Sequence, residues 1–143
     1  METLPLRLPP DVDLRGALEA AVAGRDGTAA FVVAGIGSLR SARVRRAGAA
    51  APDAMGGDLE ILSLSGTIAA GGAHLHVALA DAQGRVSGGH VGYGCTVRTT
   101  AEVLVLLLPE WSFAREPDAA TGFAELVVRP AADAATAGDG SAR

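Results

Sequence analysis

The chain has 143 residues, 49% of them apolar and 20% charged, a composition typical of a single globular domain rather than of a disordered segment. All 12 basic residues are arginines, which excludes a Walker-type phosphate loop and Schiff-base chemistry, because both require lysine. A single cysteine excludes an internal disulfide and a multi-cysteine zinc site, and a net charge of −4 argues against a whole surface that binds polyanions.

The N-terminal segment predicts a short edge strand followed by a helix. Alternating leucines between Leu4 and Leu8 predict the strand, and the prolines that interrupt and follow it suit a sheet edge. Asp11 or Asp13 can cap the helix that follows. Apolar residues recur at helical spacing from Leu14 to Val22, so we expect a helix over residues 13–23 with one buried stripe.

The middle of the chain predicts a series of strands. The near-continuous apolar run Thr28–Ile36 is typical of a central strand that is buried on both faces, and Leu39–Arg46 predicts a second strand with an arginine-rich flank. Residues 47–57 are expected to form a loop. Leu59–Ile68 and His74–Ala80 alternate apolar and polar residues, so each predicts a strand with one buried face.

The C-terminal part continues the pattern. Asp81–Gly84 predicts a turn after which Arg85–Gly92 returns as a strand, and Thr99–Leu108 predicts a strongly apolar strand that ends at Pro109. Residues 111–121 are expected to form a loop, and Phe123–Val128 the last strand.

These elements predict an α+β fold: an antiparallel, strongly bent sheet of about seven or eight strands with one main helix packed on one face. One helix cannot cover both faces of such a sheet, so a second layer or another subunit must cover the rest. Residues 130–143 are rich in Ala, Asp and Gly and are expected to form a disordered tail after a domain over residues 1–129. No targeting or membrane segment is visible, which predicts a cytoplasmic protein.

Three histidines form the most informative pattern in the sequence. His74 and His76 are two residues apart on a strand, so both point to one face. A type I turn followed by a left-handed Gly84 makes Ala82–Gly84 the hairpin loop, and this register places His76 directly opposite His90. A strict two-residue loop would instead send His90 to the other face.

Three imidazoles among small residues on the non-core face predict a divalent metal site, with zinc as the expected ion. Three imidazoles and an open fourth position are the ligand set of catalytic zinc. Metal affinity is then expected to fall below about pH 6, because only neutral imidazole binds the ion. The alternative is that the histidines are ordinary surface residues of a strand that bind nothing.

Other residues suggest further chemistry. Glu102 interrupts an apolar strand and is a candidate general base, the alternative being an ion pair with Arg98. Cys95 follows the strand of His90 and is either near the metal or a small buried residue. Four closely spaced arginines can contact DNA phosphates or form a solvated strand edge: Arg40, Arg43, Arg45 and Arg46.

Several short segments, in order along residues 6–128, resemble the signature of the plants-and-prokaryotes-conserved (PPC) domain family. These segments are Gly57–Gly66, His74–His76, Gly84–His90, Thr99–Val103 and Thr121–Phe123.

The resemblance implies a compact α+β domain that assembles as a homotrimer. The sequence matches the stand-alone bacterial and archaeal type, which carries the histidine set, and has no AT-hook of the plant type. The fold is also similar to that of acetolactate decarboxylase, a zinc enzyme, which implies a possible metal-dependent lyase or hydrolase. Bacterial members are often named as DNA-binding proteins, so the resemblance implies two functions: a three-histidine metal site with a small-molecule ligand, or DNA binding through the arginine segment.

Overall fold

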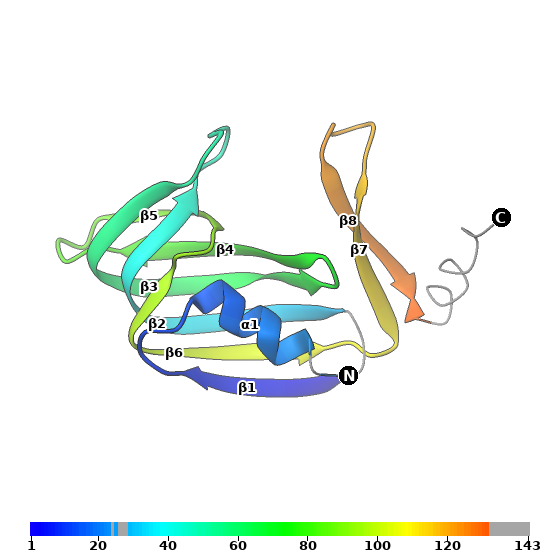
Figure 1. The fold of residues 1–143 in the computed structure, drawn as a ribbon, viewed down its shortest axis with the longest axis horizontal. Coiled ribbons are helices and arrows are strands. Elements are labelled where there is room, and N and C mark those ends of the chain that lie inside the picture. Colours follow the sequence, from blue (N-terminus) through cyan, green and yellow to red (C-terminus); the bar gives the residue numbers. More distant parts are fainter. Residues whose placement is uncertain (24, 26–28, 132–143) are drawn as a thin grey trace.

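The computed structural model describes residues 1–23, 25 and 29–131, which form two antiparallel sheets and a ten-residue α-helix (Figure 1). The elements in chain order are β1 (Glu2–Leu8), α1 (Leu14–Ala23), β2 (Ala30–Arg45), β3 (Asp53–Ala69), β4 (Gly72–Ala80), β5 (Val86–Val91), β6 (Thr96–Leu107), β7 (Trp111–Pro117) and β8 (Ala124–Pro130).

The larger sheet has six strands in the order β1-β6-β2-β3-β4-β5, and every pairing is antiparallel. The end of β2 also pairs with β5, through Val44 opposite Val91 and Arg45 opposite His90. β5 therefore has neighbours on both sides, and the sheet curls back on itself at this end. The α+β class and the bent antiparallel sheet are confirmed.

The helix α1 packs on the apolar face of this sheet. Asp13 caps it, because its Oδ1 accepts a hydrogen bond from the Gly16 N–H at 2.7 Å. Leu14, Leu18 and Val22 form the predicted buried stripe and pack against the inward-facing residues of the sheet. The helix and its cap are as the sequence predicts.

The two strands expected around residues 28–46 form one continuous strand, β2. At Gly37 (φ 137°) a Cβ atom would lie only 2.2 Å from the Thr100 carbonyl oxygen, so glycine lets β2 continue close against β6. The prediction that the first part of β2 is buried on both faces is wrong for a single chain. Phe31, Val33 and Ile36 are 39%, 52% and 57% exposed, because the helix covers the opposite face.

The region expected to be a loop at residues 111–121 contains the strand β7, so that prediction is wrong. β7 pairs with β8 along its whole length in a separate hairpin, which stands at one end of the sheet (Figure 1). Phe113 anchors the hairpin, because it is buried and its ring makes an edge-to-face contact with Phe31 at 5.5 Å. Cross-strand pairing and this aromatic contact order a segment that contains few apolar residues.

Most of the predicted tail, residues 132–143, lies outside the described residues. None of the helices in the described ranges has the length and apolar character that crossing a bilayer requires.

Candidate metal centre

The β4–β5 hairpin sets the register that the histidine site needs. Asp81 and Arg85 close the loop through the Asp81 N–H, which donates to the Arg85 carbonyl at 3.0 Å, and Gly84 takes the left-handed conformation with φ of 75°. The Asp81 carboxylate also accepts hydrogen bonds from the backbone N–H groups of Gln83 and Arg85. His76 therefore lies directly opposite His90, as the loop type predicts.

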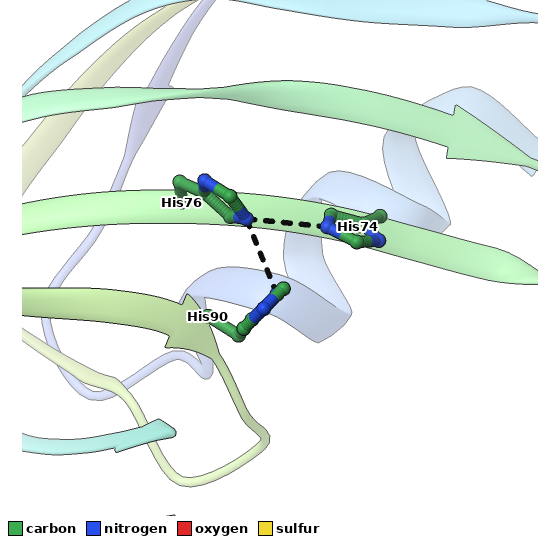
Figure 2. A group of neighbouring side chains, drawn as sticks. All are labelled: His74, His76 and His90. Carbon is green, nitrogen blue, oxygen red and sulfur yellow. Dashed lines mark hydrogen bonds between the residues drawn. The ribbon is translucent and has the colours of Figure 1, made fainter. Parts of the chain in front are cut away.

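The three imidazoles converge on one point outside the sheet (Figure 2). Nε2 of His76 lies 3.2 Å from Nε2 of His74 and 3.2 Å from Nδ1 of His90. One ring nitrogen of each residue lies within 4.8 Å of the others. Two nitrogens bound at 2.0–2.1 Å to one tetrahedral zinc ion are about 3.3–3.4 Å apart, which the two 3.2 Å spacings match. Nitrogens 4.8 Å apart are too far from each other to share one ion, so the three rings would close up slightly on binding it.

Proton counting also favours an ion at this point. Each ring nitrogen carries either one proton or one lone pair. Nε2 of His76 faces two other ring nitrogens, but with one proton or one lone pair it can form a good hydrogen bond with only one of them. A cation that accepts one lone pair from each ring satisfies all three.

The surroundings favour the uncharged form of His74 and His90. The pKa of His74 is lowered to about 4, mainly by burial and next by the positive charge of Arg115. Burial also lowers the pKa of His90, with smaller contributions from the charges of Arg45, His76 and Arg115. The lowered pKa values keep these two rings neutral near neutral pH, and neutral imidazole is the form that binds metal ions.

Two arginines flank the histidines on opposite sides. Arg45 pairs with His90 across β2 and β5, so both side chains are on the same face of the sheet. Arg115, from the β7–β8 hairpin, donates a hydrogen bond to Oγ1 of Thr67 at 3.2 Å, and Thr67 pairs with His74 across β3 and β4.

A pocket of about 280 Å³ opens beside His74 and His90. Its charged wall residues are Arg15 and Arg45, and none of its lining residues is acidic. The remaining lining residues are Pro52, Ala73, Leu75, Val91 and Gly92.

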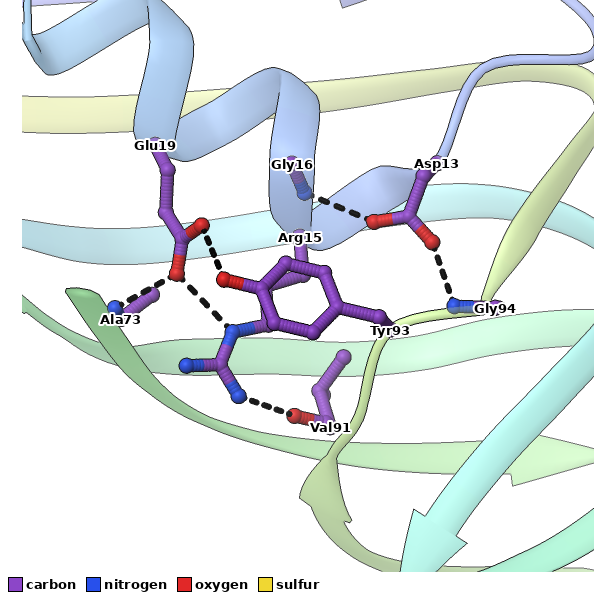
Figure 3. Close-up of polar contacts among 8 residues, drawn as sticks. All are labelled: Asp13, Arg15, Gly16, Glu19, Ala73, Val91, Tyr93 and Gly94. Atoms are coloured by element: carbon purple, nitrogen blue, oxygen red, sulfur yellow. Dashed lines mark hydrogen bonds and ion pairs between the residues drawn. The ribbon is translucent and has the colours of Figure 1, made fainter.

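A polar cluster on α1 fixes the two strand ends that carry the histidines (Figure 3). Glu19 Oε1 accepts hydrogen bonds from the N–H of Ala73 at 2.8 Å and from Nε of Arg15 at 2.9 Å. The Tyr93 hydroxyl donates to Glu19 Oε2 at 2.7 Å, and Arg15 Nη1 donates to the Val91 carbonyl at 3.3 Å. Ala73 precedes His74 and Val91 follows His90, so the cluster holds the backbone next to two of the three rings.

Asp13 also connects the start of α1 to the segment after β5 through hydrogen bonds. Its Oδ2 accepts a hydrogen bond from the Gly94 N–H at 2.6 Å, while its Oδ1 caps α1. The guanidinium of Arg15 also stacks over the Tyr93 ring, 4.5 Å from its centroid. The helix start and the segment after β5 are thereby joined.

The structure does not bring the other two candidate residues to the histidines. Glu102 is exposed on β6, opposite Arg7 and Ile36, and β2 and β3 lie between its strand and β4. Its expected partner Arg98 instead pairs with Asp58 at 3.0 Å. Cys95 is fully buried in the core, where burial raises the pKa of its thiol. Of its two predicted roles, it is therefore the small buried residue and not a neighbour of the metal.

The arginine segment is divided by the structure. Arg40 pairs with Asp11 at 2.8 Å and Arg46 with Asp53 at 2.7 Å, so two of the four charges are locally compensated. Arg43 is exposed, and Arg45 lines the pocket beside the histidines. The four side chains therefore do not present one continuous basic surface.

Sequence reasoning missed Arg15, Glu19, Tyr93 and Arg115 as residues of this site. Glu19 and Arg15 have the spacing of a helical ion pair, which gives no sign of their contacts with the distant strands. Arg115 lay in a segment expected to be a loop, so nothing in the local sequence placed it beside β3.

Comparison of the sequence with known families and proteins gives a consistent result. Residues 1–109 match the model of the Plants and Prokaryotes Conserved (PCC) domain. Two proteins named "Bifunctional protein GlmU", from Synechococcus sp. strains JA-2-3B'a(2-13) and JA-3-3Ab, are each 42% identical to the chain over 92% and 94% of its length. The chain spans only 21% and 22% of these two relatives.

Solved structures show the same fold. A Salmonella enterica protein described as hypothetical is 38% identical with a TM-score of 0.87, over 91% of this chain and 94% of its own. A metal-containing protein of Archaeoglobus fulgidus is 28% identical with a TM-score of 0.74, over 89% of this chain and 94% of its own. A Ralstonia eutropha protein that is provisionally named DNA-binding is 22% identical with a TM-score of 0.71, over 87% and 90%, and shows the fold alone.

Proposed function

The chain belongs to the Plants and Prokaryotes Conserved domain family, and from this premise we propose that it is a homotrimeric protein that binds one divalent metal ion per chain through His74, His76 and His90. The observation that carries the proposal is the convergence of three ring nitrogens within 4.8 Å of one another. The similarity to a metal-containing archaeal protein supports it.

Zinc is the ion that we propose for this site. A ligand set of imidazole nitrogens suits zinc, and both ring nitrogens, Nε2 and Nδ1, serve as its ligands. The described residues offer no fourth His, Cys, Asp or Glu in the group, which leaves a coordination position for water or a ligand.

When bound, such an ion acts as a Lewis acid or lowers the pKa of a bound water. The chain's own residues hold the rings in place: the hairpin register brings His90 to His76, and the Glu19–Arg15–Tyr93 cluster holds the adjacent backbone. A metal-dependent lyase or hydrolase reaction is the activity expected from the resemblance noted in the sequence. Glu102 is too far across the sheet to act at this site within one chain, so we propose no catalytic role for it there.

The exposed apolar face of the sheet supports assembly with further copies of the chain, and the family resemblance favours three. Val33, Ile36 and Leu62 are each more than half exposed, and they lie on the side away from α1. A shallow apolar hollow of about 560 Å³ continues this face over β1, β6 and β2, between Pro5, Ile36 and Leu104. A second copy of the chain would remove this surface from water, and closed symmetry would limit the assembly.

DNA binding through the arginine segment receives less support from the geometry. Arg40 and Arg46 already pair with Asp11 and Asp53, and the net charge is −4. If DNA does bind, its affinity should fall steeply with salt and weaken when Arg43 and Arg45 are both replaced by alanine. We propose that the chain alone binds DNA weakly or not at all. Tight sequence-selective binding at physiological salt would instead favour DNA binding over metal binding as the function.

We propose residues 1–129 as the functional domain and a cytoplasmic location for it.

Metal content tests the central proposal. Untagged protein purified without chelators should contain about one zinc or other divalent ion per chain by plasma mass spectrometry. His76→Ala should lose the ion, and the matched control Asp58→Ala, which changes a surface ion pair away from the site, should retain it. A wild-type protein that binds no metal, or His76→Ala with an unchanged content, would contradict the proposal.

A further inference from the structure

The pocket next to the histidines has an unusual charge balance. Arg15 and Arg45 are the charged residues in its wall, and His74 and His90 form its side toward the rings. The charge of Arg15 is offset by Glu19, whose carboxylate is 2.9 Å away. None of the described carboxylates forms an ion pair with Arg45, whose Nη1 donates only to the carbonyl of Ala49, at 3.4 Å.

A second arginine, Arg115, lies on the other flank of the histidines. It donates a hydrogen bond to Thr67, the cross-strand partner of His74, and it forms a long ion pair with Glu125, 3.8 Å from Nη1. Three neutral imidazoles contribute no negative charge to an ion of charge +2. An ion held there between Arg45 and Arg115 would therefore lack charge compensation from its own ligands.

We propose that this pocket binds the anionic group of a small molecule, a carboxylate or a phosphate, with Arg45 as its main charge partner. The inference rests on the metal site proposed above, because one oxygen of the ligand would take the open coordination position while the guanidinium of Arg45 binds the rest of the anionic group. The planar guanidinium suits carboxylate and phosphate equally, through paired hydrogen bonds.

The size of the pocket limits the ligand. About 280 Å³ is close to the lower end of the roughly 300–1,000 Å³ typical of small-molecule pockets, so the ligand is compact. The apolar part of the wall, which includes Pro52, suits a short carbon skeleton attached to the anionic group.

The test separates anion binding from metal binding. Untagged apoprotein is loaded with Co²⁺, whose visible absorption reports the coordination shell, for wild type, Arg45→Gln, Arg45→Lys and Arg46→Gln. Arg46 is the matched control: it is the neighbouring residue, pairs with Asp53 and does not line the pocket. All four proteins should bind about one Co²⁺ per chain, which also shows that each has folded.

Each loaded protein is then titrated with acetate, methylphosphonate and neutral acetamide. Acetate or methylphosphonate should change the Co²⁺ spectrum of wild type, and the more effective of the two identifies the anionic group. The half-saturating concentration should rise about tenfold or more in Arg45→Gln, less in Arg45→Lys, and stay unchanged in Arg46→Gln. Acetamide should have no effect.

The outcomes separate the two proposals. If wild type does not bind Co²⁺, both the metal site and the anion site are wrong. If Co²⁺ binds but the anions act equally on wild type, Arg45→Gln and Arg46→Gln, or acetamide acts like acetate, only the anion site is wrong.

Discussion

The ring of His90 reaches the other two only because its strand returns in one particular register. Its Nδ1 is 3.2 Å from Nε2 of His76, and the ring is half-buried. We predict that His90→Ala weakens zinc binding by more than the roughly 10–100-fold that loss of a supporting partner costs, because a direct ligand is removed. Competition with a chromogenic zinc chelator measures the affinity. The control Ser87→Ala, on the same strand, should bind zinc like wild type.

Glu19 is the residue that most directly couples the helix to the histidine strands. Its carboxylate accepts hydrogen bonds from Ala73, Arg15 and Tyr93, and its side chain is only 20% exposed. We predict that Glu19→Ala lowers the free energy of unfolding by about 1–3 kcal/mol, because the backbone N–H of Ala73 loses its partner. The control Glu2→Ala removes only an exposed ion pair with Arg25, so it should change the free energy of unfolding by less than about 0.5 kcal/mol, as measured by urea unfolding. Equal losses in the two variants would contradict this role.

The same carboxylate predicts the pH dependence of stability. Burial raises the pKa of Glu19, but the hydrogen bonds from Ala73, Tyr93 and Arg15 outweigh it and lower the pKa below its ordinary value of 4.5. A carboxyl with a lowered folded pKa stabilises the protein fully above pH 4.5, and this contribution disappears as the pH falls through the folded pKa. We therefore expect the stability difference between wild type and Glu19→Ala to shrink on acidification. Urea unfolding at about pH 7 and about pH 4 measures it, and a difference that grows at the lower pH would contradict the assignment.

At the scale of elements, the β4–β5 loop controls the site. Gly84 has a φ of 75° that favours glycine, and the loop length decides which face His90 occupies. We predict that deleting Gln83 abolishes zinc binding although all three histidines remain, because a one-residue change of register sends His90 to the opposite face. Gly84→Asn, which tolerates the left-handed conformation, should keep the metal. Zinc titration by calorimetry makes the comparison, and full affinity after the deletion would show that the loop does not set the site.

Elements with local signals could be predicted from the sequence, and those that depend on distant contacts could not. The capping Asp13 and the Asp81–Gly84 turn specify α1 and the hairpin within a few residues of chain. β7 becomes a strand through pairing with β8 and the contact of Phe113 with Phe31, neither of which its own sequence encodes. The alternation over Leu59–Ile68 predicts one buried face, but Leu62 is 53% exposed while Leu64 is buried, because a bulge between Ile61 and Ser63 shifts Leu62 outward.

The same distinction applies to the site. The histidines were identifiable because two of them share one strand and the third follows a turn of readable type. Arg45 was noticed only as part of a basic segment, since its pairing with His90 depends on the curl that brings β2 to β5. Arg115 depends on the docking of a separate hairpin.

At the scale of the whole molecule, the face of the sheet away from α1 predicts assembly. Ile36 is 57% exposed, so Ile36→Arg should leave the fold of a single chain intact and disrupt a subunit interface on this face. We expect light scattering after size exclusion to give about three times 14.3 kDa for wild type and a lower mass for Ile36→Arg. Val86→Arg, a substitution of another exposed residue at the hairpin loop, should keep the wild-type mass. A monomeric wild type with an intact circular dichroism spectrum would contradict the trimer.

The metal centre is tested most directly by anomalous diffraction at the zinc edge from crystals of untagged protein grown with zinc. We predict one strong anomalous peak per chain, about 2.0–2.1 Å from Nε2 of His74, Nε2 of His76 and Nδ1 of His90. No peak at this point, or rings that point away from one another, would contradict it.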